Sequence, residues 1–423
     1  MSELETTMII REVEQLEEYL LLTRRFLHEN PEIDAQEVQT SAFCRHELDK
    51  LGLTPQMVSE NGFFAIIDSG NPGKNLVLRA DMDGLALNES ETNLTKKKLA
   101  VSKIPGRCHA CGHDGHMAML LGVAKILCRH IKEFSGRIIL VFESGEETFC
   151  TTKQICTMLK REKADAIWAI HLNNSMPQGM ISVDAGPRTT GLFEFDYTIT
   201  GQGGHSSRPD QSVNPIFAAA AILSAFGSVV PLNLNPLDMG VVTPCIVRSG
   251  DARNVIPESC VIAGSGRFLK KEDYLQLNSK LDCLADGIAR SYGCTCKRTH
   301  GYDLANGALP VINDQLLSDI AKNAILKIQP EAYYHRGPWM ASETFGDYGE
   351  VLPSILAFLG IANLSQGFGA PHHNGNFDFD EKVLSIGVKA TVQFAVDYLN
   401  SSLLQRMPAS DVANSEEVPI SVL

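Results

Sequence analysis

The sequence predicts an α/β protein, in which a doubly wound domain is interrupted by a small inserted α+β sandwich domain. The chain has 423 residues, and a single core rarely serves more than roughly 250–300, so two domains are expected. β-rich runs alternate with helical patterns in both outer parts, which predicts a mostly parallel sheet with helices on both faces. Between about residues 188 and 298 the order changes to β-α-β-β-α, which is typical of a small α+β sandwich.

The first part of the doubly wound domain is assigned to residues 1–187. Apolar residues recur every three or four positions over 9–52, which predicts helices there, one of them at 37–50. The predicted elements that follow are strands at 63–67 and 76–79, a helix at 116–131, a strand at 137–142, a helix at 155–162 and a strand at 166–172.

The insertion, residues 188–298, is expected to act as a lid or dimerisation domain. Its predicted elements are a strand from 193, a helix at 215–226, strands at 240–247 and 259–268, and a helix at 272–291. Residues 299–405 resume the doubly wound pattern, with helices at 314–327 and 381–399. Hinges are expected near 186–188 and 300–302, and residues 406–423 read as a polar, flexible tail.

Composition excludes several classes of function. The net charge is −13, from 37 Lys and Arg against 50 Asp and Glu, which argues against a nucleic-acid or membrane-surface partner. The longest apolar stretch, 217–232, is too short to span a membrane, and no signal peptide is recognisable. The 11 cysteines are an odd number, which favours reduced thiols and a cytoplasmic location.

The densest chemical signal is CHACGHDGH at 108–116, with two thiols and three imidazoles in nine residues. Thiolate and imidazole are the ligands that zinc-like ions prefer. We predict a metal site with Cys111 and His113 as ligands, both pointing the same way from an extended segment, and Asp114 as the cap of the next helix. A redox pair of Cys108 and Cys111 is the alternative, although such pairs do not come with three histidines.

Two adjacent glutamates, Glu146 and Glu147, follow the predicted strand that ends at 142. An extended chain would send them to opposite sides, so that one could bind a metal and the other could act as a general base. His171 ends another predicted strand, and ligands of open α/β sheets bind beyond such ends. Either His372 or His373 could close the site, and the spacing does not decide between them.

The inserted domain carries a further candidate in GQGGHSSRP at 201–209. The glycines around His205 suggest a tight loop that presents an imidazole. A plain turn between a strand and a helix is an equally good interpretation.

In this order, the segments resemble the aminoacylase/hippurate hydrolase family of metallopeptidase-related amidohydrolases. The similarity is greatest to the branch of indoleacetyl-amino-acid hydrolases and N-acetyl-diaminopimelate deacetylases. It extends over nearly the whole chain, and HACGHDGH followed by GEE is its most specific part. The matching text is LHENPE (27–32), RADMDGL (79–85), HACGHDGH (109–116), GEE (145–147), AIHL (169–172), GGHSSRP (203–209), RNVIP (253–257), FGDYGE (345–350) and HHNGNFDFDE (372–381).

The resemblance implies a peptidase-like catalytic domain that carries a small lid, through which the chain could form a homodimer. It implies one or two divalent metal ions, with zinc favoured and manganese, cobalt or nickel as alternatives. By position, it assigns the metal ligands to Cys111, His113, Glu147, His171 and His373. It assigns the general base to Glu146, a substrate-binding or carbonyl-polarising role to His205, and more loosely substrate contacts to Asn254 and Arg267.

The implied reaction is metal-dependent hydrolysis of an N-acyl amino acid to a carboxylic acid and a free amino acid. A dipeptidase or carboxypeptidase with the same site is the alternative, and a non-catalytic binding relative is less favoured because no ligand position is lost. The sequence departs from the family pattern at Ala86, where proline is usual, at Glu143 in place of glutamine, and at Thr344 in place of aspartate. Glu143 would favour a cationic or polar part of the substrate.

Overall fold

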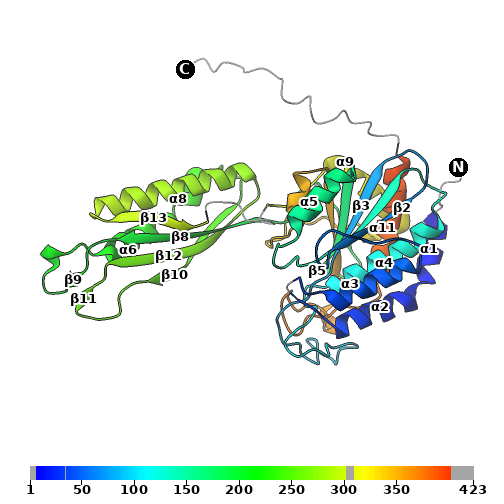
Figure 1. Ribbon diagram of the computed structural model, residues 1–423, viewed down its shortest axis with the longest axis horizontal. Coiled ribbons are helices and arrows are strands. Elements are labelled where there is room, and N and C mark those ends of the chain that lie inside the picture. The colour runs from blue at the N-terminus through cyan, green and yellow to red at the C-terminus, as the bar shows by residue number, and fades with distance from the viewer. Residues whose placement is uncertain (1–5, 34, 302–308, 402–423) are drawn as a thin grey trace, which may run out of the picture.

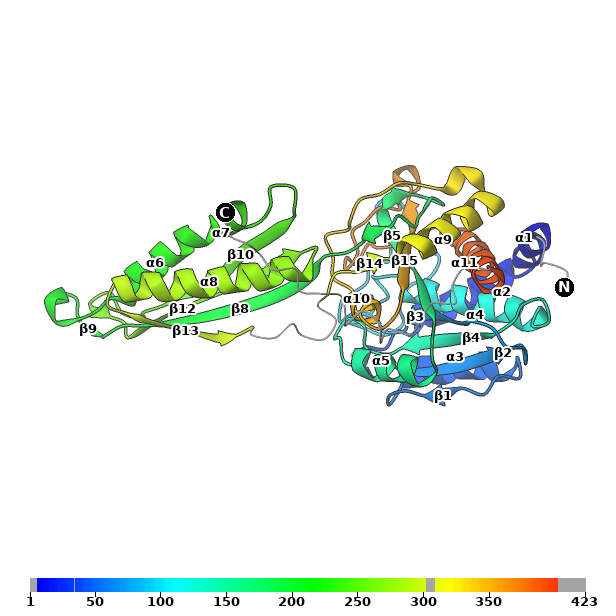
Figure 2. The same ribbon diagram turned by 90° about the horizontal axis from the view of Figure 1, so that it is seen from above.

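The computed structural model describes residues 6–33, 35–301 and 309–401, which form two bodies (Figures 1 and 2). The predicted tail and part of the hinge predicted at 300–302 lie outside these residues. Two short strands, β7 (Gly186–Pro187) and β14 (Ile312–Asn313), pair with each other where the chain leaves and re-enters the larger body. The smaller body is therefore an insertion, and its division at 187/188 and 298/299 stays a prediction.

The larger body is built on a seven-stranded sheet. Its order is β1-β2-β4-β3-β5-β15-β6, and the four central strands, from β4 to β15, are parallel. The mostly parallel sheet is therefore confirmed, with antiparallel strands only toward its edges. Its strands are β1 (Gln56–Met57), β2 (Phe63–Asp68), β3 (Asn75–Asp81), β4 (Arg137–Glu143), β5 (Ala166–Pro177), β6 (Ile181–Ser182) and β15 (Ser354–Ala362).

Helices cover both faces of this sheet because successive strand residues point to opposite sides. Leu78 and Ala80 face the core shared with most of the helices, whereas Val77 faces the core that contains α5 and α10. The helices on the first face are α1 (Thr6–Glu14), α2 (Glu17–Glu29), α3 (Val38–Asp49), α4 (His113–Arg129), α9 (Gln315–Ile328) and α11 (Val383–Asn400); those on the second are α5 (Thr152–Arg161) and α10 (Phe345–Gly349).

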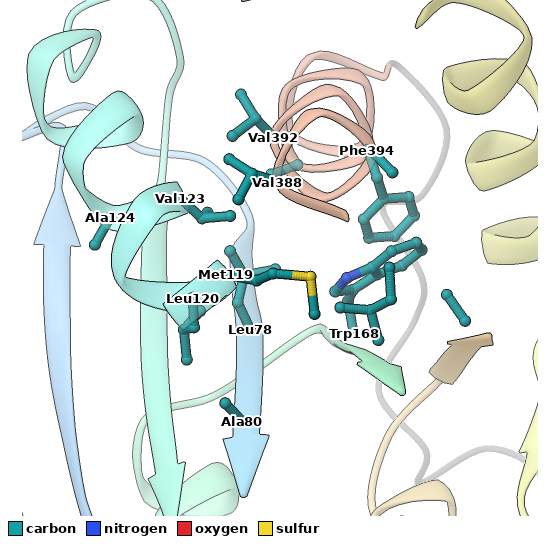
Figure 3. Close-up of a cluster of buried hydrophobic side chains, with 14 of the residues drawn as sticks. Leu78, Ala80, Met119, Leu120, Val123, Ala124, Trp168, Val388, Val392 and Phe394 are labelled. Atoms are coloured by element: carbon teal, nitrogen blue, oxygen red, sulfur yellow. The ribbon is translucent and has the colours of Figure 1, made fainter. Parts of the chain in front are cut away.

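Trp168 of β5 is the largest side chain of the first core and lies among residues of α4 and α11 (Figure 3). Its ring stacks on Phe394 with centroids 4.4 Å apart, and its indole N–H donates to Thr391 Oγ1 at 3.1 Å. Trp168→Phe should lower the free energy of unfolding by about 1–3 kcal/mol, because it leaves a small cavity and an unpaired hydroxyl. Urea denaturation measures this change, and an unaltered midpoint would contradict it.

The smaller body is a four-stranded antiparallel sheet in the order β10-β12-β8-β13. Burial alternates along β8, so one sheet face packs in a separate core and the other meets water. This agrees with the α+β sandwich predicted for the insertion. Its main elements are β8 (Gly191–Thr200), α6 (Pro215–Phe226), α7 (Val229–Asn233), β10 (Gly240–Arg248), β12 (Ser259–Phe268), α8 (Lys271–Ser291) and β13 (Thr295–His300); β9 (Gly204–His205) and β11 (Val255–Ile256) form a separate short ribbon.

Several elements differ from the sequence prediction. β13 and β15 were not predicted, and the first helical region is divided into α1 and α2. The helix predicted to begin at His116 begins at His113, which moves a candidate ligand onto a helix. Among the described residues, no helix has the length and apolar character needed to cross a membrane.

Candidate metal centre

The predicted ligands of the catalytic domain gather at the carboxyl ends of the parallel strands. β3 ends at Asp81, β4 ends at Glu143 just before Glu146 and Glu147, and β5 carries His171. The N-terminus of α4 brings His113 to the same edge. This is where ligands of open α/β sheets bind.

A tight turn, rather than an extended segment, brings Cys111 and His113 into the site. Gly112 has a left-handed backbone with φ of 94°, and a Cβ there would lie 2.9 Å from a methyl carbon of Leu172. Only glycine fits such a position without strain. The expected extended segment is therefore wrong, although Cys111 and His113 each share a donor group with Glu147.

Asp114 does not cap α4, contrary to the prediction, because no side chain caps this helix. Its carboxylate is buried and accepts from Arg24 Nε at 2.7 Å and pairs with His28 Nδ1 at 2.8 Å. Burial opposes ionisation, but Arg24 and His28 outweigh it and lower the pKa of Asp114 far below its usual value. Asp114 therefore ties α4 to α2 beneath the site.

The hydrogen bonds of His113 and His171 leave one nitrogen of each ring free to bind a metal. His113 Nδ1 donates to the backbone oxygen of Asp83 at 2.8 Å, and His171 Nδ1 donates to the oxygen of Leu172 at 2.7 Å. When the ring is neutral, each Nε2 then carries a lone pair, and His113 Nε2 is buried with no hydrogen-bond partner in the described chain. Such bonds orient the histidine ligands of metals.

His116 lies beside these rings but has no free nitrogen. Its Nδ1 donates to Asp81 Oδ1 at 2.7 Å, and its Nε2 accepts from the backbone N–H of Leu172 at 2.9 Å. Asp81 and His116 belong to a buried group with His113 and His171 whose polar atoms lie within 4.8 Å of one another. Sequence reasoning gave neither residue a role; the alternating carboxylates of RADMDGL, at a strand end, were the signal for Asp81.

Cys111, Glu147 and His373 form a second group of donor atoms within 4.8 Å of one another. Cys111 Sγ lies 3.7 Å from His171 Nε2, and Glu147 Oε1 lies 3.2 Å from His373 Nε2. Glu147 also joins a third group with His113 and Glu146, so the donor atoms form one continuous set.

The two histidines left open by the sequence have different surroundings. His372 packs against Trp339 and Phe377, with ring centroids 4.9 Å away in each case. Burial and the neighbouring His171 lower the pKa of His372 well below its usual value. His373, which has a left-handed backbone with φ of 59°, is the one placed beside Glu147.

Glu146 lies in a turn rather than in an extended segment, so the alternation predicted for Glu146 and Glu147 does not hold. Its carboxylate Oε1 accepts from the backbone N–H of Thr344 at 3.1 Å. Burial raises the pKa of Glu146 well above its ordinary value, and the carboxylates of Glu343 and Glu147 raise it further. A raised pKa suits a group that must take up and release a proton.

The assembled donors fit divalent metal ions. They offer one thiol sulfur, a carboxylate and the nitrogens of imidazole rings, two of which are oriented by a hydrogen bond from the other ring nitrogen. Zinc and neighbouring transition metals bind this mixture of donors. His113 Nε2 and Glu147 Oε1, which belong to the same donor group, are both buried without a hydrogen-bond partner in the described chain, as expected of atoms that bind a metal.

The thiols do not favour a redox site. All 11 cysteines are free, and burial raises the pKa of Cys108 to about 12. Burial, with Glu147 and Glu146, also raises the pKa of Cys111 well above its usual value. Reactive redox thiols need a lowered pKa instead, so the pairing of Cys108 and Cys111 loses support.

The predicted residues of the inserted domain fall in two places. His205 and Asn254 lie together, because the backbone N–H of Ser206 donates to the oxygen of Asn254 at 3.1 Å and β9 pairs with β11. Both side chains are exposed, and β9 lies at the end of the insertion farthest from the larger body (Figures 1 and 2). Arg267, in contrast, donates from Nη1 to Ser342 Oγ at 3.1 Å, close to the Thr344 amide.

Comparison with known proteins places this arrangement in context. Residues 77–397 match the profile of "Peptidase family M20/M25/M40". The chain is 33% identical over 386 residues to IAA-amino acid hydrolase ILR1-like 4 of Arabidopsis thaliana, covering 90% of this chain and 86% of the relative. It is 30% identical to N-acetylcysteine deacetylase of Bacillus subtilis, covering 90% and 97%.

Two further relatives are informative. Thermostable carboxypeptidase 2 of Saccharolobus solfataricus is 29% identical, covering 92% of this chain and 98% of the relative. The crystal structure of the YXEP protein of Bacillus subtilis, described as a dinuclear metal binding peptidase, superposes with a TM-score of 0.78 at 27% identity, covering 91% of this chain and 99% of that one.

Proposed function

Because the chain belongs to peptidase family M20/M25/M40, whose members here include amidohydrolases of amino-acid conjugates, we propose that it hydrolyses N-acyl amino acids. The products are a carboxylic acid and a free amino acid. The observation that carries this proposal is the position of a buried carboxylate, Glu146, beside a continuous set of metal-binding atoms. All 11 thiols are free, and we place the enzyme in the cytoplasm.

We assign the metal ligands to Cys111, His113, Glu147, His171 and His373. Two divalent ions can share these donors, with zinc first and manganese, cobalt or nickel as alternatives. When bound, such ions polarise the scissile carbonyl and lower the pKa of a water molecule toward about 7. The backbone oxygens of Asp83 and Leu172 orient His113 and His171, and His116, held by Asp81, bonds to the backbone N–H of Leu172.

Glu146 is the general base in this scheme. It removes a proton from water as the oxygen adds to the amide carbon, and the C–N bond breaks as Glu146 returns that proton to the leaving nitrogen. The Thr344 N–H, 3.1 Å from Oε1, would hold the carboxylate in place for both transfers.

We propose that a second copy of the chain delivers His205. Its loop lies at the far end of the insertion (Figure 1), where it is remote from the metal centre of its own chain. β10 is an edge strand whose residues Ile246 and Val247 are 41% and 53% exposed, which suits pairing between two insertions. His205 and Asn254 would then contact the substrate in the partner's site, whereas Arg267 would act in its own.

A mixing experiment tests this arrangement. His205→Ala and Glu146→Gln should each be nearly inactive alone, but subunit exchange forms heterodimers with one intact site. An equal mixture should recover about a quarter of wild-type activity, since half the dimers are mixed and each has one working site of two. A mixture no more active than its components would contradict delivery in trans.

Carboxypeptidase activity is the second candidate, because one relative with 29% identity carries that name. A panel of N-acetyl and indoleacetyl amino acids, unblocked dipeptides and N-blocked peptides separates the two functions. We expect the first group to give the highest kcat/KM. Preference for N-blocked peptides would favour the carboxypeptidase, and preference for unblocked dipeptides a dipeptidase.

A further inference from the structure

Arg79 of β3 is a buried cation at the centre of the residues beneath the site. It is 5% exposed and carries its guanidinium among three carboxylates. Nη1 donates to Asp81 Oδ2 at 2.7 Å, Nε to Glu143 Oε2 at 2.6 Å, and Nη2 to Glu343 Oε1 at 3.1 Å. Glu143 and Asp81 are fully buried, so neither is available to contact a substrate in this structure.

The same guanidinium fixes the segment that holds the general base. Arg79 Nη2 donates to Thr344 Oγ1 at 3.0 Å, and that hydroxyl donates to Glu343 Oε1 at 3.2 Å. The backbone N–H of Thr344 is the donor to Glu146. A continuous path of hydrogen bonds therefore runs from Glu143 through Arg79 and Thr344 to Glu146.

The position of Arg79 depends on the charges of the groups around it. One guanidinium faces three carboxylates at hydrogen-bond distance, and the fourth close partner, Thr344, is neutral. Adding or removing one negative charge around Arg79 changes the balance in a site from which water is excluded, where charges interact strongly. Glu143 and Thr344 meet at this guanidinium.

We propose that Glu143 and Thr344 are positioning residues, which hold Arg79 and, through it, the Thr344 amide against the carboxylate of Glu146. The earlier expectation that Glu143 contacts the substrate is replaced by this role. The proposal rests on the function assigned to Glu146 above. It predicts that a negative charge at 143 can be exchanged for one at 344, because both side chains touch the same guanidinium.

A double-mutant cycle tests the exchange. Glu143→Gln removes one charge and Thr344→Asp adds one, so each alone should lower kcat about tenfold with KM within about twofold. The double variant restores the total charge and should recover to within about threefold of wild type. Thr344→Val should lower kcat about tenfold, and Thr344→Ser, which keeps the hydroxyl, should lower kcat at most about twofold.

Controls separate positioning from simple destabilisation. Metal content and thermal melting are measured for every variant. Glu47→Gln is the matched control, because Glu47 is a buried carboxylate of α3 that pairs with Lys50 just after the helix; it should lower the melting temperature without lowering kcat. Loss of kcat in Glu143→Gln at unchanged metal content and full folding supports positioning.

Two results would overturn the proposal: wild-type kcat in Glu143→Gln, or a double variant whose loss is the product of the two single losses. The melting temperatures give an independent cycle, in which the two single variants should melt lower than the double variant. If the wild-type protein hydrolysed no N-acyl amino acid, the proposed function would fail, and this melting cycle would still decide whether the two residues are coupled.

Discussion

Glu146→Gln should lower kcat by about 10²–10⁴-fold, the range that general acid–base catalysis contributes. Glutamine keeps the size of the side chain and an oxygen that accepts the Thr344 N–H, but it cannot take a proton from water. KM and metal content should change little, because Glu146 is assigned no direct part in holding metal or substrate. Steady-state kinetics, with metal analysis of the same sample, measure both quantities.

The adjacent glutamate provides the control for this result. Glu147→Gln should lower metal content as well as activity, since Glu147 shares donor groups with Cys111, His113 and His373. The two variants therefore differ in metal analysis even if both are inactive. A Glu146→Gln enzyme with full activity would remove Glu146 from its role as the base.

His113→Gln should lower activity by at least about 10³-fold and reduce the bound metal. His113 belongs to two of the three donor groups, so its loss should weaken metal binding by both groups. Loss of a metal ligand has a larger effect than loss of a residue that orients a ligand, which typically lowers metal affinity or activity 10–100-fold. Metal per chain, measured by elemental analysis after exhaustive dialysis, is the direct readout.

His109, in the same motif, is the matched control for His113. It is buried, and burial lowers its pKa to about 4, so it is a neutral histidine like a metal ligand. It belongs to none of the three donor groups. His109→Gln should therefore keep its bound metal, and equal metal loss in the two variants would contradict the ligand assignment.

The sequence predicted the larger features of the fold because they depend on local patterns. The runs RIILVF and AIWAIHL are continuously apolar, which is typical of strands buried on both faces, and both lie in the parallel centre of the sheet. β15 was missed although its run, SILAFLGIA, is equally apolar; a short apolar run does not by itself distinguish a strand from a buried helix. β13 is polar and half-exposed, so it gave little signal.

The site was predicted less completely because its geometry depends on long-range contacts. Cys111, His113 and the two glutamates stand out by composition, but the orientation of the first two depends on the left-handed turn at Gly112, and the glutamates lie in another turn that follows β4. His116 and Asp81 acquire their roles only through partners on β3, α4 and β5. Glu143 is opposite Asp81, and within reach of the Arg79 side chain, because of the register between β4 and β3, which the sequence alone does not specify.

The most direct test of metal-dependent amide hydrolysis uses the enzyme with and without its metal. The protein is stripped with a chelator, the chelator is removed, and release of free amino acid from an N-acetyl or indoleacetyl amino acid is measured as zinc, manganese, cobalt or nickel is added back. We predict no hydrolysis by the stripped enzyme and recovery that saturates at one or two ions per chain. Hydrolysis that persists at full rate in the metal-free enzyme would contradict the mechanism.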